Sequence, residues 1–286
     1  MKTLAVIANC TKPRAADVLC RIHVKAEQLG LCLLADEATA ELLEAAMARP
    51  LDALFDEADA VMALGGDGTM LRTVRDLDGR DRPVMGVNIG GLGFLTSVAE
   101  EDLDRALQCL AADDLVVSEK SIAEGAILRD GREVVRCRAL NEIAIWRGPS
   151  SRVVRLEVKV GPDHVTTYVC DGLIVSTPTG STGYSLSAGG PILTPDTNAF
   201  VISLICPHTL SSRPLVVPDH SEICVTPEGN AGDMLLSADG QVDQHLQDGD
   251  CVMVNRSRRG VRFLLLPGST YFSVLRQKLN WSGHSA

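Results

Sequence analysis

Short apolar runs alternate with segments of helical periodicity over the first 113 residues. Apolar residues between Val18 and Leu29 recur at the spacing of one helical face, and Gly30 ends that pattern. Strands are expected at residues 4–8, 31–34, 60–64 and 83–88, and helices at 18–29, at 40–48, from about 69, and around 103–110. Strands joined by helices predict an α/β domain with a parallel sheet, in which ligands bind beyond the carboxyl ends of the strands.

After Leu115 the period of the apolar residues changes to two. Leu156, Val158 and Val160 alternate with charged residues, and the turn at 161–163 leads into a second run at 165–170. This pattern predicts a β-hairpin. Asp130-Gly131 lies between apolar pairs and predicts another hairpin. The region from residue 114 is therefore expected to form a mostly β, sandwich-like second domain.

Composition limits the classes of partner. The chain has 286 residues, a length that allows about two domains, and its formal charge is 27 − 37 = −10 with 3% aromatic residues. An acidic chain with few rings cannot easily build a broad basic surface, so nucleic-acid binding is not expected. An anionic phosphate substrate would have to be met locally, by backbone amides, a few arginines and a metal ion.

The cysteines and the apolar runs indicate a reducing, cytoplasmic location. Nine cysteines are scattered without a CxxC pair, so they are interpreted as small buried apolar residues and not as a zinc or redox site. No apolar run approaches the length of about 20 residues needed to span a bilayer, and the start of the chain is typical of a first strand. No membrane association is expected.

The segment Gly65-Gly66-Asp67-Gly68-Thr69 lies directly between an expected strand and an expected helix. Glycines let a phosphate approach the backbone, and a helix N-terminus favours its negative charge. Asp67 is unfavourable beside a phosphate unless it accepts a proton, holds a hydroxyl group or works beside Mg²⁺. The alternative interpretation is a tight turn in which Asp67 caps the helix.

A second segment, Asp171 to Pro191, is rich in hydroxyl groups and small residues, with Tyr184 as its one ring. By itself it could be a strand followed by a Ser/Thr-rich loop. Its many donors also suit the phosphates and riboses of a nucleotide. The sequence has no P-loop, no dehydrogenase glycine fingerprint, no protein-kinase motif and no histidines at metal-ligand spacing.

Taken together, these segments resemble the NAD kinase family over nearly the whole chain. The matching segments are Gly65 to Arg72, Gly86 to Thr96, Asn141-Glu142, Asp171 to Pro191, Asp239-Gly240-Gln241, and the tail from Tyr271-Phe272 through Lys278 to Trp281. The segment around Asp67 is moderately specific, because diacylglycerol-type lipid kinases and phosphofructokinases carry similar loops. The block from Asp171 to Pro191 is highly specific.

The resemblance implies an α/β domain made of residues 1–113 and a returning C-terminal segment, 269–286, with a β-rich NAD-binding domain at 114–268. Leu275 and Leu279, spaced for one helical face, agree with a docking helix in that segment. The implied reaction transfers the γ-phosphoryl group of ATP to the 2′-hydroxyl of the adenosine ribose of NAD. Mg²⁺ or another divalent metal is the implied cofactor, with no protein ligand assigned, and a homodimer or homotetramer is the implied assembly.

The resemblance also implies roles for individual residues. Asp67 would be the proton acceptor, beside a phosphate loop that contains Gly65, Gly66 and Thr69. The residues that would bind NAD are Gly68, Arg72, Asn141, Glu142, Arg152, Asp171, Thr182, Gly183, Tyr184, Ser185, Leu186, Ser187 and Gln241. For Arg152, a solvated position at the start of a strand is an equal alternative.

Two positions depart from the family pattern. Gly183 stands where the family usually has alanine, which removes one methyl contact. Val169 stands where relatives often show arginine or glycine, a difference associated with the choice between ATP and polyphosphate.

Two other functions are considered. A lipid kinase would share the Gly65 to Thr69 loop, but it should need a membrane-facing surface that is often basic and aromatic. A non-catalytic regulator could bind a dinucleotide without phosphorylating it. The presence of Asp67 together with the whole nucleotide loop favours an enzyme.

Overall fold

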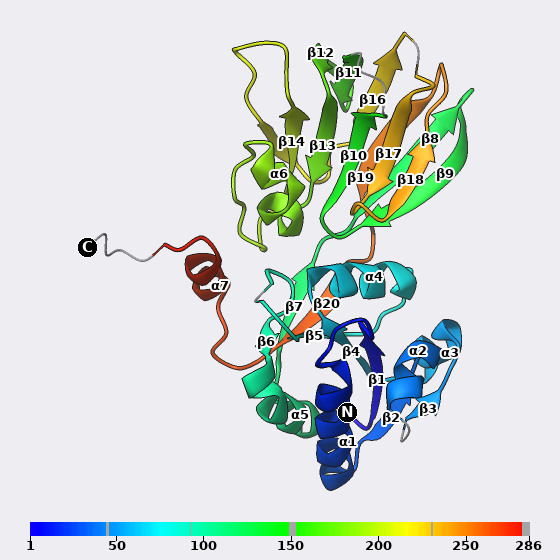
Figure 1. Cartoon of the computed structure of the whole chain (residues 1–286). Coiled ribbons are helices and arrows are strands. Elements are labelled where there is room, and N and C mark those ends of the chain that lie inside the picture. Colours follow the sequence, from blue (N-terminus) through cyan, green and yellow to red (C-terminus); the bar gives the residue numbers. More distant parts are fainter. Residues whose placement is uncertain (44–45, 92, 149–152, 230, 282–286) are drawn as a thin grey trace. The chain divides into compact units, whose positions relative to one another are not determined.

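The computed structural model describes residues 1–43, 46–91, 93–148, 153–229 and 231–281. They divide into two compact units, unit 1 made of Met1–Glu119 with Val261–Ala286, and unit 2 made of Lys120–Gly260 (Figure 1). The divisions fall at 119/120 and 260/261, whereas the sequence predicted 113/114 and 268/269. The chain passes between the units twice, and a strand lies next to each of these points. The difference arises because both strands, Val116–Lys120 and Val261–Leu265, are part of the sheet of unit 1.

Unit 1 contains an eight-stranded sheet with the order β3-β2-β1-β4-β5-β20-β7, and β6 pairs with β5. Its strands are β1 (Thr3–Ala8), β2 (Cys32–Ala35), β3 (Met47–Ala48), β4 (Ala60–Gly65), β5 (Val84–Asn88), β6 (Val98–Ala99), β7 (Val116–Lys120) and β20 (Val261–Leu265). The pairings of β1 with β2 and β4, and of β5 with β4, are parallel, as the sequence predicted. β20 also pairs with β5 in parallel, although the sequence analysis had placed residues 261–265 in the second domain.

Helices cover both faces of this sheet. They are α1 (Ala15–Leu29), α2 (Glu37–Leu42), α3 (Leu51–Glu57), α4 (Asp67–Leu77) and α5 (Leu103–Ala112), with a 3₁₀ turn at Glu100–Asp102. The last helix of the unit, α7 (Tyr271–Lys278), stands apart from the sheet (Figure 1). The apolar faces of α1 and α5 share one core cluster with alternate residues of β1, Leu4 and Val6. Ala5 and Ile7 are also fully buried, so the other face is covered as well, and α3 and α4 contact β1 from there.

Local residue chemistry explains two of the helix ends. Gly30 adopts a left-handed conformation after α1, and its amide donates to the last carbonyls of the helix. The helix expected at 40–48 is wrong at both ends. It begins at Glu37 because Asp36 caps the amide of Thr39, and Met47–Ala48 instead pairs with β2 as strand β3.

Unit 2 consists of two antiparallel six-stranded sheets, with the orders β15-β14-β13-β10-β17-β18 and β12-β11-β16-β19-β8-β9. Its strands are β8 (Ala123–Arg129), β9 (Arg132–Ala139), β10 (Glu142–Arg147), β11 (Val154–Val160), β12 (Asp163–Cys170), β13 (Gly172–Ser176), β14 (Ala199–Ile205), β15 (Leu215–Pro218), β16 (Ile223–Glu228), β17 (Met234–Ala238), β18 (Val242–His245) and β19 (Cys251–Arg256). A 3₁₀ turn at Thr179–Thr182 and the short helix α6 (Tyr184–Ser187) follow β13.

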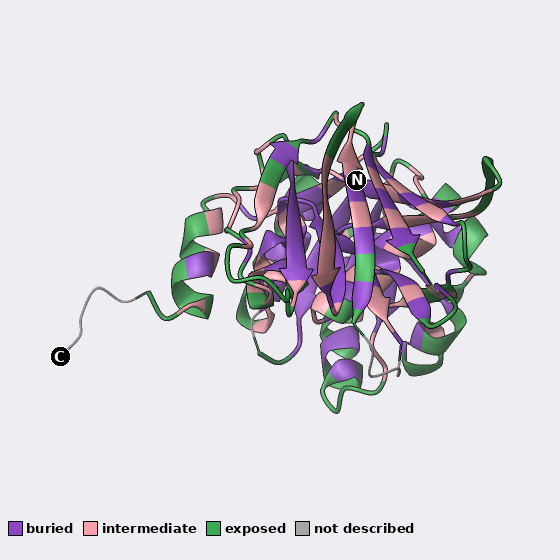
Figure 2. Ribbon diagram, turned by 90° about the horizontal axis from the view of Figure 1, so that it is seen from above, coloured by how far each residue is buried: buried purple, intermediate pink, exposed green. Residues whose placement is uncertain are grey.

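The two sheets of unit 2 share one apolar core. Leu156 and Val252 from one sheet belong to the same buried cluster as Ile145 and Leu173 from the other. The buried residues are coloured purple in Figure 2. The hairpins predicted on either side of Asp130-Gly131 and of residues 161–163 are confirmed as β8–β9 and β11–β12. The predicted sandwich-like domain is therefore confirmed.

The C-terminal segment is part of unit 1. It enters through β20, which pairs with β5, and continues into α7. Leu275 is 2% exposed, whereas Phe272 is 57% exposed, so α7 contacts the unit with one narrow face. The ammonium group of Lys278 lies 5.6 Å from the centre of the Phe94 ring, which ties α7 to the loop that precedes β6.

The cysteines differ from the expectation. Cys170 is buried, but Cys20, Cys32 and Cys206 are exposed, and the sulfur atoms of Cys224 on β16 and Cys251 on β19 lie against each other. The general interpretation of the cysteines as small buried residues was therefore wrong. Among the described helices, none has the length and apolar character needed to cross a membrane.

Candidate active site

The glycine-rich turn of unit 1 connects the end of β4 to the start of α4. A Cβ atom at Gly65, the last residue of β4, would collide with the side chain of Thr69, so only glycine fits there. The amides of Thr69 and Met70 donate to the carbonyl of Gly66 at 3.0 and 3.2 Å and begin the helix. The turn therefore lies at the carboxyl end of a central parallel strand, where the sequence predicted it.

The Asp67 carboxylate is held by the loop that follows β5. Its Oδ2 accepts a hydrogen bond from the amide of Phe94 at 2.9 Å, and its Oδ1 accepts from the amides of Leu95 and Thr96 at 3.0 and 3.3 Å. A carboxylate oxygen can accept about two hydrogen bonds. Oδ1 is therefore saturated, whereas Oδ2 keeps one lone pair for another donor.

Gly93 is what allows this loop to approach the carboxylate. A Cβ atom at position 93 would overlap the Oδ1 atom of Asp67 and crowd the Thr96 hydroxyl. The sequence reasoning used the segment around Gly93 only as part of the resemblance and did not connect it to Asp67. The connection requires two loops that follow different strands, β4 and β5.

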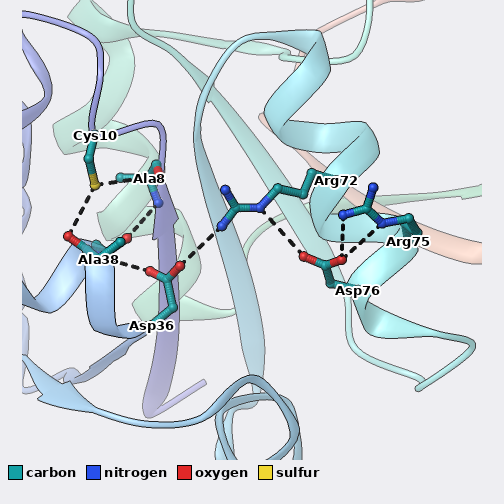
Figure 3. A network of polar contacts seen from close by, with 8 residues as sticks. Ala8, Cys10, Asp36, Ala38, Arg72, Arg75 and Asp76 are labelled. Atoms are coloured by element: carbon teal, nitrogen blue, oxygen red, sulfur yellow. Dashed lines mark hydrogen bonds and ion pairs between the residues drawn. The ribbon is translucent and has the colours of Figure 1, made fainter. Parts of the chain in front are cut away.

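Arg72 lies on α4, one turn after Asp67, between two acidic side chains (Figure 3). Its guanidinium contacts Asp36 at 3.2 Å and Asp76 at 3.6 Å, and the Asp36 carboxylate also caps α2. The arginine is thus oriented by acids on two elements. These partners balance its charge before any ligand binds, and the ion pairs are partly exposed and therefore weak.

A cavity of about 340 Å³ in unit 1 brings together several predicted residues. It is lined by Asn9, Lys12, Gly66, Gly68, Thr69 and Arg72. The sequence reasoning missed Asn9 and Lys12, which follow β1. Their position after a central parallel strand, next to the strand that carries the glycine-rich turn, is the signal that could have revealed them. The cavity combines a helix N-terminus with two cationic side chains, which is suitable chemistry for phosphate.

In unit 2, Asn141 and Glu142 start strand β10 and are fixed by Asp239. The Asp239 carboxylate accepts hydrogen bonds from the amides of Leu140, Asn141 and Glu142 at 2.8, 2.7 and 3.1 Å. Asp239 itself has φ +53°, a left-handed conformation that aspartate and asparagine tolerate better than most residues. The sequence reasoning assigned a role to Gln241 in this turn and missed the three hydrogen bonds that the Asp239 carboxylate accepts.

Removing the Asp239 carboxylate should increase the mobility of the Asn141-Glu142 segment. Asp239→Ala is expected to lower the free energy of unfolding by about 2–4 kcal/mol, because it leaves three amides without their charged acceptor. It should also raise the KM for a ligand held by Asn141 and Glu142. Asp239→Asn keeps one carbonyl oxygen and the left-handed tolerance, so it should cost less than half as much. Urea denaturation of both variants measures their free energies of unfolding. Equal values for the two variants would contradict a stabilising role for the hydrogen bonds to Asp239.

Glu142 lines a second cavity, of about 230 Å³, together with Ala144, Trp146, Tyr184, Ser237, Gly240 and Asp243. Burial and, to a smaller extent, the nearby Asp239 carboxylate raise the pKa of the Glu142 carboxyl to about 8, although a hydrogen bond from the backbone amide of Tyr184 acts in the opposite direction. The Oε2 atom of Glu142 and the Oδ1 atom of Asn141 are buried without a hydrogen-bond partner among the described residues. Buried polar atoms of this kind need a partner, and a bound ligand can supply it.

The predicted nucleotide loop follows β13. Some of its side chains are buried, and others are exposed to solvent. The Ser185 hydroxyl is fully buried and lies 3.0 Å from the Ser203 hydroxyl, so it has a structural partner. The Thr182 hydroxyl donates to the carbonyl of Thr179 at 3.2 Å. Tyr184 and Ser187 are exposed and Leu186 is half-buried. Burial raises the pKa of the Tyr184 hydroxyl, and the neighbouring Cys206, Glu142 and Asp171 add to that effect.

Gly183, in this loop, lies close to the side chains of Asn141 and Glu142 at the start of β10. A methyl group at this position would lie 3.4 Å from the Oε2 atom of Glu142 and 3.5 Å from the Nδ2 atom of Asn141, and 3.2 Å from the carbonyl of Gly180. Glycine therefore leaves room beside the two unpartnered side chains. Gly180 itself is obligatory, because its Cβ would collide with the backbone of Asn141.

The remaining predicted residues lie around these loops. Asp171 pairs with Arg147, whose Nε and Nη2 atoms lie 3.1 and 3.2 Å from the two carboxylate oxygens. Gln241 lies in the turn after β17, where its amide donates to the carbonyl of Ala238 at 3.0 Å. Val169 is on β12, and its carbonyl accepts from the amide of His208 at 2.8 Å. Arg152 lies outside the described residues.

Solved structures share this fold. The chain is similar to the crystal structure of yeast NADH kinase complexed with NADH, with a TM-score of 0.91 and 24% identity, covering 100% of this chain and 89% of that one. It is also similar to an NAD kinase from Archaeoglobus fulgidus in complex with ATP, with a TM-score of 0.78 and 26% identity, covering 98% and 100% of the two chains. The fold and the glycine-rich turn define a nucleotide-dependent kinase.

The sequence comparisons give the family. The profile of the ATP-NAD kinase N-terminal domain matches residues 12–115, and that of the C-terminal domain matches residues 140–266. The chain is 38% identical to the NAD kinase of Trichlorobacter lovleyi over 98% of this chain and 99% of the relative, and 39% identical to that of Moorella thermoacetica over 99% and 91%. The chain therefore belongs to the NAD kinase family, as the resemblance indicated.

Proposed function

We propose that the chain converts NAD to NADP by transferring the γ-phosphoryl group of ATP to the 2′-hydroxyl of the adenosine ribose. Membership of the NAD kinase family gives the overall reaction. The observation that carries the detailed proposal is the position of Asp67, the first residue of α4 in the glycine-rich turn. Three backbone amides of the loop after β5 donate hydrogen bonds to its carboxylate and fix it there. Because those bonds fix its orientation, the group needs little reorganisation to accept a proton.

In this mechanism the Oδ2 atom of Asp67 accepts the proton of the ribose hydroxyl. The hydroxyl oxygen forms a bond to the γ-phosphorus while the bond from that phosphorus to the bridging oxygen breaks, and ADP leaves. The amides of Leu95 and Thr96 saturate Oδ1, so Oδ2 is the oxygen with a lone pair left for the substrate. Phosphoryl transfer otherwise needs mainly positioning and charge neutralisation.

The donor phosphates are assigned to the cavity of unit 1. Lys12 supplies positive charge, and the Arg72 guanidinium, whose charge is already balanced by Asp36 and Asp76, supplies hydrogen-bond donors. The first turn of α4 supplies amides and the favourable end of the helix dipole. Gly66 and Gly68 keep the backbone of this cavity free of side chains. A Cβ at either glycine would meet nothing within 4 Å, so the space beside them is open.

Mg²⁺ is the proposed cofactor. Among the described residues, no group of three His, Cys, Asp or Glu side chains could hold a metal ion. Mg²⁺ commonly binds through substrate phosphates with one or two carboxylates and water, so this residue set fits an ion that arrives with ATP. The remaining lone pair of Asp67 is assigned to the ribose hydroxyl, so no protein ligand is assigned to the ion. When bound, the ion would neutralise charge on the transferring phosphoryl group.

The dinucleotide is assigned to the loops of unit 2. Asn141 and Glu142 have unpartnered oxygens that can accept hydrogen bonds, and the exposed Tyr184 offers a ring for stacking. We assign supporting contacts to Asp171, Gln241, Arg152 and the loop from Thr182 to Ser187. The buried Ser185 would act by holding the loop, because its hydroxyl already bonds to Ser203.

The test is the formation of NADP by the purified full chain with ATP and Mg²⁺. NADP is expected with NAD as the acceptor, whereas diacylglycerol should remain unphosphorylated. Parallel reactions with polyphosphate as the donor and with NADH as the acceptor measure the substrate range, in which Val169 is the residue of interest. Binding of NAD without NADP formation would instead favour a non-catalytic regulator, and phosphorylation of diacylglycerol would favour the lipid kinase.

The proposal includes a homodimer or homotetramer in the cytoplasm. Exposed apolar side chains on β7, Val116 at 50% and Val117 at 54%, are compatible with a subunit contact. Light scattering on the purified chain measures the assembly directly.

A further inference from the structure

Glu142 combines three properties that bear on its protonation state. The residue is 7% exposed, its Oε2 atom has no hydrogen-bond partner among the described residues, and it borders a cavity of about 230 Å³. An ionised carboxylate in such a place would have no cationic side chain in the cavity lining to balance it among the described residues. Burying it in that form is costly, so the neutral acid is the favoured form of the empty site.

The groups around Glu142 strengthen this preference. Asp239 on the turn after β17 is the nearest source of negative charge, and Asp243 on β18 lines the same cavity. On the side of α6, Tyr184 contributes a neutral phenol and a backbone amide. On β9, the Cys137 thiol is also affected by Asp239, and burial raises its pKa to about 11. Asp171, near Tyr184, is paired with Arg147.

The lining of the cavity selects the part of a dinucleotide that can enter. Its side chains include the carboxyl groups of Glu142 and Asp243 and no lysine, arginine or histidine among the described residues. Pyrophosphate would be repelled by this lining. The hydroxyl, amino and carboxamide groups of the nucleosides are hydrogen-bond donors, and they match the unpartnered oxygens of Glu142 and Asn141.

We propose that binding of NAD to this chain releases one proton from Glu142, because the carboxyl group ionises to accept hydrogen bonds from the donor groups of the nucleoside in the cavity. The inference rests on the proposed function, since it takes NAD as the ligand. In the balanced step, the carboxylic acid and NAD give the carboxylate complex and a proton that passes to solvent. Gly183 assists by leaving space beside Oε2.

The expected pH dependence has a definite sign. The pKa of Glu142 is raised to about 8 in the empty site. Below that value each NAD bound must displace a proton, so the affinity should increase as the pH rises and become constant above about pH 8. Linkage predicts a decrease in Kd of roughly five- to tenfold between pH 6.5 and 7.5, and release of about 0.9 proton per NAD at pH 7.

Isothermal titration of the full chain with NAD tests this coupling directly. Titrations at pH 7 in buffers of different ionisation enthalpy count the protons released, and a series from pH 6 to pH 9 gives the Kd profile. Glu142→Gln should bind NAD without proton release and with a nearly flat profile. Asp243→Asn removes the other carboxyl group of the same cavity and should keep the proton release, and the exposed Glu222→Gln should match the parent chain.

The folded state of Glu142→Gln is checked by its circular dichroism and unfolding midpoint. In the parent chain, ¹³C NMR of labelled glutamate carboxyls should show one group that titrates near pH 8 without NAD and that is ionised at pH 7 with NAD. A flat profile without proton release in the parent chain would overturn the coupling, as would full release in Glu142→Gln. Absence of NAD binding at every pH would overturn the proposed function itself and the coupling with it.

Discussion

Asp67→Asn is expected to lower the kcat for NADP formation by about 10²–10⁴, the usual contribution of a general base. The ribose hydroxyl is a weak nucleophile, and an amide at position 67 cannot take its proton. The binding of NAD and ATP should change little, because the phosphate cavity of unit 1 is lined by other residues of the turn. Steady-state kinetics together with direct binding of both substrates measures the two effects separately.

The structure adds a complication that the same experiment must address. Asparagine would place an NH₂ group against at least one of the amides that now donate to Asp67, and two donors repel each other. Part of the loss could therefore come from a displaced loop. Asp67→Glu retains a base but moves it by one methylene, so it should recover some turnover and show a pH dependence that Asp67→Asn lacks. Turnover near the parent value in Asp67→Asn would refute the role of base.

Gly93→Ala is expected to reduce kcat by about 10²-fold although residue 93 carries no functional group. Its Cβ would occupy the space of the Asp67 Oδ1 atom, so either the carboxylate or the loop must move. A displacement of about 1 Å at a reacting group can cost this much. The amides of Leu95 and Thr96 would also lose their acceptor, which should reduce the free energy of unfolding by about 1–3 kcal/mol.

Gly91→Ala is the matched control, because a Cβ at Gly91 would meet nothing within 4 Å. Both variants lose the same backbone freedom in the same loop, and only one displaces Asp67. Kinetics and thermal melting of the pair should therefore separate the effect on the carboxylate from a general stiffening of the loop. Equal kcat values for the two variants would show that the contact between residues 93 and 67 does not control turnover.

Much of the fold could be predicted because its signals are local. The change from helical periodicity to a period of two identified an α/β region followed by a β region, and the turn residues Asp130-Gly131 located a hairpin. The failure at residues 40–48 has a tertiary cause. The segment is rich in alanine and favours a helix, yet Met47–Ala48 pairs with the exposed edge of β2. Propensity is a weak preference that such pairing can override.

The candidate site divides in the same way. The glycines around Asp67 and the start of β10 were recognisable as short motifs, since a turn between a strand and a helix has its own residue requirements. The partners of these residues were not recognisable. Asp239 lies 97 residues or more from the three amides that it holds, and the loop that fixes Asp67 follows a different strand.

The sequence by itself therefore determined the division into an α/β region and a β region, the family, and the residue types that can carry phosphoryl transfer, because these depend on neighbours along the chain. Only the tertiary structure decided that Asp67 has one oxygen left for a substrate and that Arg72 is already balanced by Asp36 and Asp76. It also decided that the Oε2 atom of Glu142 is buried without a hydrogen-bond partner among the described residues. Those properties depend on strand register and on the packing of distant segments. A carboxyl group acquires its protonation state from the groups that surround it in space, and no local pattern in the sequence encodes them.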